Sequence, residues 1–309
     1  MATAHPKVTP LIQSSIAALM AIATAGCGAE DGFGRSTRVE EIGSVPQGFT
    51  TTLAQGDRVP VTTQSRSDWT QVTFNQPFAA PPIVVVGPPT SNGNQPAVVR
   101  AKDVTATGFK VQIREWNYLD GSHSEEYVSY LAVVPGIQNW GGLQVAAGPL
   151  TVNDAWTEIT PMVANPIALA TQVTNNGSDT TTIRIKSEAG KVKFRLQEQE
   201  SLSGAHTDET LHVILFQRTT GTLSGLPVSA YSEYFDDAWG SPNEFAGLAQ
   251  MQTTNGADPA GLRIDMPFPC QNILCPFYGP LRVQEEQSAD SETDHNTEEV
   301  GFVKIGFSL

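Results

Sequence analysis

The sequence predicts an all-β protein built from three tandem, small antiparallel β-sandwich domains. Short runs rich in Val, Ile and Thr alternate with clusters of Pro, Gly and Asn, and no helical periodicity competes with them. Charged residues are sparse, at 16% of the 309 residues, which is typical of exported β proteins. The same landmarks also recur three times in the same order, which indicates repeated structural units.

The first 27 residues predict export. Lys7 precedes a moderately apolar run, LIQSSIAALMAIATAGC, which is too short and too polar to be a membrane span. Its last four residues resemble the lipobox of bacterial lipoproteins, a family in which the cysteine becomes the lipidated first residue of the mature chain. We therefore expect a signal peptide over 1–27, lipidation of Cys27 and a lipid anchor in the bacterial cell envelope, at the outer membrane or cell surface. An ordinary cleaved signal and secretion are the alternative.

The remaining two cysteines predict a small disulfide loop. Cys270 and Cys275 have four residues between them, and two thiols this close in an exported chain favour a disulfide over two free buried thiols. A lone pair at this spacing is a poor zinc site. The formal net charge of −14 argues against a nucleic-acid partner. Residues 28–56 are expected to form a tether followed by a leading strand.

The repeats are expected to be β-sandwich domains over 57–137, 138–223 and 224–309. In each, a Gly that follows Asn is itself followed seven residues later by an arginine, and a Trp lies upstream. These landmarks are Gly93, Gly177 and Gly256; Arg100, Arg184 and Arg263; and Trp69, Trp156 and Trp239. Apolar residues flank the arginines, so alternation along a strand points them away from the core. We expect them to be solvated or to lie at contacts between domains, and not to pair with the glutamates described next.

A Glu–His–Glu triad ends each repeat. A strand-like run ends in Glu, and a His-x-x-Glu motif follows; the triads are Glu115, His123 and Glu126; Glu198, His206 and Glu209; and Glu285, His295 and Glu298. A hairpin that pairs Ile113 with Val128 would place Glu115 opposite Glu126, and two facing carboxylates need a proton, a cationic partner or a metal. The favoured interpretation is a structural pin, in which the histidine ties the two glutamates together. A divalent metal site and a reactive site are the alternatives.

The first repeat resembles the H-type lectin domain. The matching residues are VTFNQPFAAPPIVVV, from Val72 to Val86, and VTATGFKVQIREW, from Val104 to Trp116. The resemblance implies a six-stranded antiparallel sandwich that assembles as a trimer, with sugar sites near the contacts between protomers. Three tandem units in one chain could imitate that trimer covalently, so we expect pseudo-threefold packing of the repeats or an oligomer.

The loop after Trp116 is the candidate sugar site. NYLDGSHSEE replaces the segment that normally follows this Trp in the family, so the family's sugar contacts do not transfer residue by residue. Aromatic faces beside polar groups still suit a sugar. The candidate residues are Trp116, Asn117, Tyr118, Asp120 and Arg100. The alternative is that Trp116 and Tyr118 only pack the loop.

These observations predict an exported, lipid-anchored surface protein that binds a glycan or polysaccharide, with adhesion as one use. The alternative is a non-catalytic structural or assembly module whose triads lock hairpins or bind metal. An enzyme is not expected, because the chain has no Gly-x-Ser-x-Gly or His-Glu-x-x-His motif. No cofactor is expected other than a divalent metal at the triads, and membrane contact is expected only through the lipid.

Overall fold

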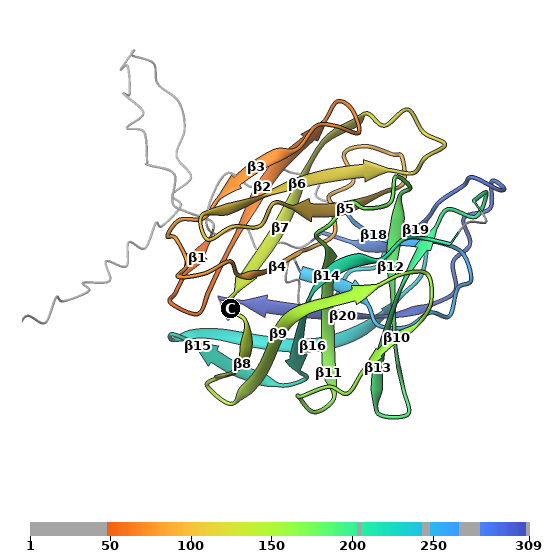
Figure 1. Cartoon of the computed structure of the whole chain (residues 1–309). Helices are drawn as coiled ribbons and strands as arrows, with labels where there is room; N and C mark the ends of the chain where they lie inside the picture. Colours follow the sequence, from red (N-terminus) through yellow and green to blue (C-terminus); the bar gives the residue numbers. More distant parts are fainter. Residues whose placement is uncertain (1–47, 203–204, 243–247, 266–278, 307–309) are drawn as a thin grey trace, which may run out of the picture. The chain divides into compact units, whose positions relative to one another are not determined.

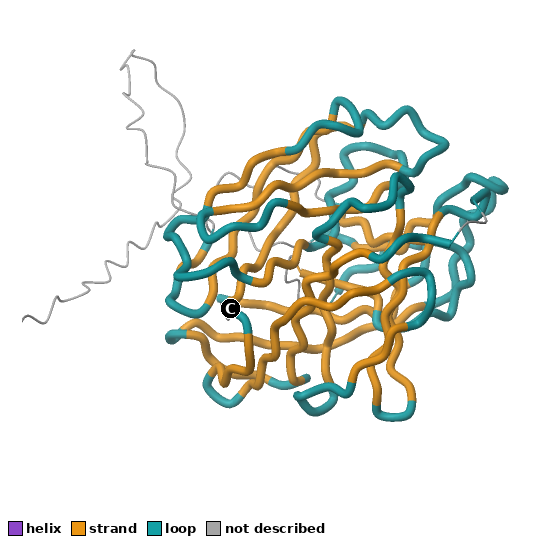
Figure 2. Tube along the Cα trace, in the orientation of Figure 1, coloured by secondary structure: helices purple, strands orange, loops and turns teal. Residues whose placement is uncertain are grey.

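Antiparallel strands make up the regular structure of the chain (Figures 1 and 2). The computed structural model describes residues 48–202, 205–242, 248–265 and 279–306, and the stretch Ser44–Leu309 forms one compact unit. The described residues include no helix, and therefore none long and apolar enough to cross a membrane. The all-β prediction is confirmed, whereas the division into three separate domains stays a prediction.

The first repeat forms two sheets that pack face to face. The strand orders are β1-β2-β7-β4 for the inner sheet and β3-β6-β5 for the outer sheet. The strands are β1 (Phe49–Thr50), β2 (Ala54–Thr63), β3 (Thr70–Thr73), β4 (Ile83–Val86), β5 (Ala97–Lys102), β6 (Gly108–Glu115) and β7 (His123–Val133). Strands β2 to β7 form the six-stranded sandwich that the resemblance implies.

The second repeat has the same arrangement, with orders β11-β14-β9-β8 and β10-β13-β12. Its strands are β8 (Gly136–Trp140), β9 (Leu143–Val152), β10 (Thr157–Ile159), β11 (Pro166–Gln172), β12 (Thr181–Glu188), β13 (Lys191–Glu198) and β14 (Glu209–Gln217). The third repeat has orders β15-β16-β20-β17 and β18-β19. Its strands are β15 (Thr220–Leu223), β16 (Leu226–Phe235), β17 (Leu248–Met251), β18 (Ala260–Ile264), β19 (Leu281–Glu285) and β20 (Glu298–Ile305). We count β15 with the third repeat because it pairs with β16, although it precedes residue 224.

The predicted hairpin between the two glutamates of a triad is wrong. Ile113 on β6 pairs with Val99 on β5, and Val128 on β7 pairs with Val59 on β2, so the two strands lie in different sheets. The segment between them crosses from the outer to the inner sheet of the sandwich. Each triad therefore joins two packed sheets instead of closing a turn between neighbouring strands.

Each inner sheet is apolar on both faces. On β7, Val128 and Tyr130 point into the core of their own sandwich, whereas Leu131 and Val133 point into a central core that all three repeats share. Phe216 of the second repeat and Val303 of the third repeat belong to the same central core. Three sandwich cores thus surround one common core, and burial of apolar surface holds the repeats together as well as each repeat.

Candidate functional site

Each histidine of the triads bridges the two sheets of its sandwich. His123 Nδ1 lies 3.0 Å from Glu115 Oε1, and its Nε2 lies 3.1 Å from Glu126 Oε1. His295 contacts Glu285 through Nδ1, and its Nε2 lies 3.2 Å from Glu298 Oε1. In the second repeat the corresponding distances for His206 are 2.7 Å to Glu198 and a longer 3.5 Å to Glu209.

The two carboxylates of a triad lie at opposite nitrogens of the imidazole ring. A single cation cannot contact both carboxylates and one ring nitrogen in this arrangement, because the ring itself stands between them. The residues of the three triads are buried, except Glu198, which is half-buried. The contacts therefore favour the structural pin over a metal site formed by these nine residues.

A Thr-x-Asn-Gly segment surrounds the second glutamate of each triad. Glu126 accepts hydrogen bonds from the Thr90 hydroxyl and from the backbone N–H groups of Asn92 and Gly93. The Asn92 side chain donates to the carbonyl of Glu125, over 2.8 Å. In the same way, the Thr174 hydroxyl and the Gly177 N–H donate to Glu209. The Thr253 hydroxyl and the Gly256 N–H donate to Glu298.

The threonine of this segment escaped the sequence analysis, although its spacing shows it. Thr90, Thr174 and Thr253 each precede the repeated glycine by three residues. Each hydroxyl donates to the glutamate and accepts from the backbone N–H that follows the glutamate. Only glycine fits at this position without a clash, because a Cβ on Gly256 would lie 2.3 Å from Cε1 of His295.

These contacts shift the ionisation of the triads. Burial alone raises the pKa of Glu298, but the hydrogen bonds from His295, Thr253 and the backbone outweigh burial and lower it to about 2. The same balance lowers the pKa of Glu209 to about 2. Burial lowers the pKa of His295, yet the hydrogen bonds to Glu298 and Glu285 raise it above its ordinary value. Hydrogen bonds with Glu209 and Glu198 raise the pKa of His206 in the same way.

The repeated arginines join the repeats in a cycle. Arg184 of the second repeat donates to the carbonyls of Gly256 and Asp258 and lies 3.3 Å from Glu298 Oε1, all in the third repeat. Arg263 of the third repeat donates to the carbonyl of Gly93 and lies 2.7 Å from Glu126 Oε1, in the first repeat.

Arg100 completes the cycle from the first repeat to the second. It donates to the Asn175 side chain, the Asp179 carbonyl and the Thr181 hydroxyl. The expectation that these arginines point away from their own core and lie at contacts between repeats agrees with the structure. The expectation that they do not pair with the glutamates is wrong for Arg184 and Arg263, because each pairs with the triad of the next repeat.

The loops that follow the first glutamate of each triad also meet in a cycle. The backbone N–H of Asn117 donates to Gln199 Oε1 over 2.7 Å, and that of Glu200 donates to Glu286 Oε1 over 2.6 Å. The backbone N–H of Gln287 donates to the Tyr118 hydroxyl over 3.0 Å, which returns to the first repeat. We call residues 116–122, 199–202 and 286–288 the loop cluster.

The candidate sugar residues differ in their exposure. Trp116 and Arg100 are each 1% exposed, so a sugar could reach neither without a rearrangement. The Asn117 side chain is engaged with Arg66 and Asp179. Tyr118 is 39% exposed, and Asp120 is exposed as well. Tyr118 and Asp120 are therefore the candidates that a glycan can contact directly.

An acidic group lies beside the loop cluster. Asp258, Glu285 and Glu292 each bring one carboxylate oxygen within 4.8 Å of the others. Nearby, a hydrogen bond with Asp258, together with burial and the charges of Glu286 and Asp290, raises the pKa of Glu200 to about 7. This junction of the second and third repeats is thus rich in negative charge.

Several predicted sites lie outside the described residues. They are Cys27 and the signal peptide, and the Cys270–Cys275 disulfide. These stay predictions.

Comparison with known proteins finds a family match within the first repeat. Residues 69–133 match the family model of the H-type lectin domain, a stretch that holds β3 to β7 and the loop after Trp116. A relative named Halomucin, from Haloquadratum walsbyi, is 27% identical over 276 residues. That alignment covers 80% of this chain but 3% of the relative, so the chain spans a small part of its length. No solved structure matches the chain.

Proposed function

Because residues 69–133 form an H-type lectin domain, we propose that the protein binds carbohydrate and that it does so at the loop cluster. The family match is the observation that carries the proposal. The half-exposed ring of Tyr118 supports it, because an aromatic face can stack on a sugar ring while the neighbouring carboxylate of Asp120 accepts hydrogen bonds from hydroxyls. Residues of all three repeats border this position, since Gln287 of the third repeat donates to Tyr118 and Gln199 of the second repeat accepts a hydrogen bond from the neighbouring Asn117 N–H.

A glycan array probed with the full chain, followed by calorimetric titration of the best glycan, tests this function. We expect Tyr118→Ala to weaken binding by at least tenfold, because the stacking face is lost. Tyr234→Ala is the matched control, since Tyr234 is 71% exposed on β16, in the third repeat. An array with no bound glycan, or equal losses in the two variants, would contradict the proposal.

We also propose that the protein is exported and lipid-anchored at the cell surface, where glycan binding would serve adhesion. The support is the run that ends in TAGC before the described residues. Metabolic labelling with a fatty-acid analogue should mark the wild-type chain and not a Cys27→Ser variant. No labelling of either chain would favour secretion through an ordinary cleaved signal, and equal labelling of the two would place the lipid on a residue other than Cys27.

The protein acts without catalysis in this proposal, and the triads serve stability. The support is the burial of all three histidines and the saturation of Glu126 and its equivalents with hydrogen bonds from the protein itself. Turnover of a bound glycan that is lost on changing His123 would contradict it.

A further inference from the structure

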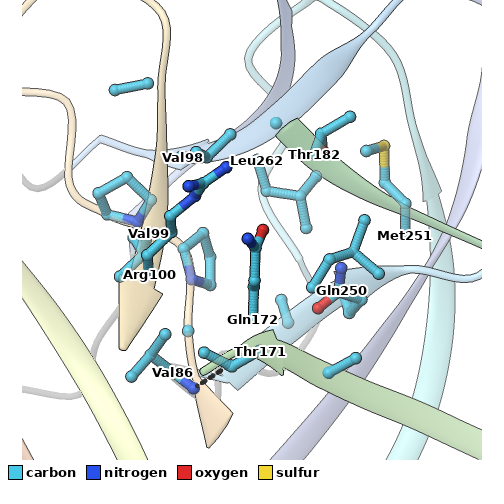
Figure 3. Close-up of a pocket in the computed structure, with 18 of the residues that line it drawn as sticks. Val86, Val98, Val99, Arg100, Thr171, Gln172, Thr182, Gln250, Met251 and Leu262 are labelled. Carbon is cyan, nitrogen blue, oxygen red and sulfur yellow. Dashed lines mark hydrogen bonds between the residues drawn. The ribbon is translucent and has the colours of Figure 1, made fainter. Parts of the chain in front are cut away.

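Strand β4 lies at the edge of its sheet, and side chains of the second repeat cover that edge. The order β1-β2-β7-β4 leaves β4 with one hydrogen-bonded neighbour among the described strands. The Val84 N–H donates instead to His212 Nδ1 over 2.9 Å, and the Val86 N–H donates to the Thr171 hydroxyl over 2.9 Å. Figure 3 shows the second of these hydrogen bonds. Two side chains therefore take the place that a further strand would have.

The two acceptors stand side by side on the second repeat. Thr171 on β11 lies directly opposite His212 on β14 in the antiparallel pair. Val84 and Val86 are two residues apart on β4, so their N–H groups point to the same side of the strand. We call Val84, Val86, Thr171 and His212 the β4 contact. It joins the first repeat to the second beside the central core, because His212 shares its strand face with Phe216.

His212 can make this contact only in its neutral form. Because Nδ1 accepts the Val84 N–H, the ring proton lies on Nε2. Protonation would add an N–H at Nδ1 that faces the Val84 donor, and two donors cannot form a hydrogen bond. The neighbours of His212 across its own sheet are Thr171 and Pro149, neither of which titrates. Burial alone lowers the pKa of His212 to about 4, without a contribution from any charged group among the described residues.

The matching contact between the second and third repeats contains no titratable group. The Ala168 N–H on β11 donates to Gln252 Oε1 over 2.9 Å, and Gln252 Nε2 donates to the Ala168 carbonyl over 2.8 Å. Ala168 pairs with Leu215 on β14 as Val84 pairs with Ala132 on β7, so the two contacts occupy equivalent places. An amide oxygen accepts a hydrogen bond at any pH near neutrality, whereas an imidazole nitrogen stops accepting when it is protonated.

We propose that the β4 contact is an acid-sensitive link between the first and second repeats, in which neutral His212 holds β4 against β14 and protonation of His212 releases it. Its stabilisation is complete above the unfolded pKa of 6.5 and is lost as pH falls towards the folded pKa of about 4. His206 and His295 act in the opposite direction, because their pKa values are raised in the folded state. The link does not depend on the proposed glycan site.

Hydrogen exchange of the full chain at pH 7 and pH 5, measured by mass spectrometry, tests the link. After correction for the chemical exchange rate at each pH, the equilibrium constant for opening of β4 should be roughly 20-fold larger at pH 5 in the wild type. His212→Gln should reduce this ratio to less than about twofold, because its amide oxygen accepts at both pH values as that of Gln252 does. Thr171→Val is the matched control: it removes the other acceptor, so it should open β4 more at both pH values and keep the wild-type ratio.

The imidazole NMR signals of His212, followed from pH 8 to pH 4 in the wild type, give a second measurement that does not depend on the folding of a variant. A midpoint below pH 5, with the proton on Nε2 above it, is the expected result. A midpoint near 6.5 or higher, an opening constant of β4 that is the same at both pH values, or an equal rise in His212→Gln would each overturn the proposal.

Discussion

At the scale of single residues, the glycine of each Thr-x-Asn-Gly segment is fixed by the histidine ring above it. We expect Gly256→Ala to destabilise the fold by about 1–3 kcal/mol, because its Cβ would lie 2.3 Å from His295 Cε1 and the ring would have to leave its two glutamates. Urea unfolding measures the change. Gly148→Ala is the control, since no atom lies within 4 Å of a Cβ built at Gly148. This variant should leave the free energy of unfolding unchanged or slightly increased.

The raised pKa of His295 predicts a pH-dependent contribution to stability. The groups that face the ring are Glu285, Glu298 and Arg184. Because the folded pKa exceeds the unfolded value of 6.5, the stabilisation by the imidazolium is complete below pH 6.5 and is lost as pH rises through the folded pKa. The difference in Tm between the wild type and His295→Gln should therefore shrink from pH 6 to pH 9. A difference that stays constant or grows over this range would contradict the ionised triad.

At the scale of elements, the arginine of β12 and the glutamate of β20 should be energetically coupled. We expect Arg184→Met to cost about 3–5 kcal/mol, because it removes one of the two cationic partners of the buried Glu298 and leaves His295 as the other. A double-mutant cycle with Glu298→Gln measures the coupling, and the double variant should lose less than the sum of the two single variants. Additive losses would show that the two side chains merely lie near each other.

The junction of the second and third repeats should become more stable when one carboxylate is removed. Glu200 holds its proton in the folded state up to a pH of about 7, so its interaction with Asp258 weakens stability as pH rises from 4.5 to 7. At pH 8, Glu200→Gln should stabilise the protein by roughly 1 kcal/mol, after allowance for the solvent that screens this partly exposed group. Glu125→Gln, an exposed change in the first repeat, should have no such effect in the same unfolding experiment.

The elements also show how far the sequence could predict the structure. The alternation of apolar and polar residues predicted where strands lie and on which strand face Glu115 and Glu126 stand. It cannot tell which strands pair with each other. The strands on either side of the loop that holds Tyr118 are consecutive in sequence, so a hairpin is the simplest expectation, yet they lie in opposite sheets. In the same way, alternation turned Arg263 away from its own core, whereas its partner Glu126 lies 137 residues away in sequence.

At the scale of the whole molecule, the shared central core predicts cooperative unfolding. Leu131, Phe216 and Val303 come from three repeats and pack in one cluster, so no sandwich can unfold without exposing the others. Calorimetry should show one transition, with a calorimetric enthalpy equal to the van't Hoff enthalpy. Separate transitions would mean that the three repeats are independent domains. The continuous apolar run LAVV at the end of β7 is the sequence signal for this core, because a strand buried on both faces loses its alternation.

The hairpins that link the repeats have a consequence for the order of the chain. Strand β7 leads into the hairpin β8–β9, and β14 leads into β15–β16, whereas the matching hairpin β1–β2 opens the first repeat and does not follow β20 along the chain. The third junction is nevertheless made, through Arg263 and Glu126. The fold thus has no intrinsic first repeat: a circular permutant, opened at the β8–β9 turn and closed by a short linker from the end of β20 to β1, should reach the same native state.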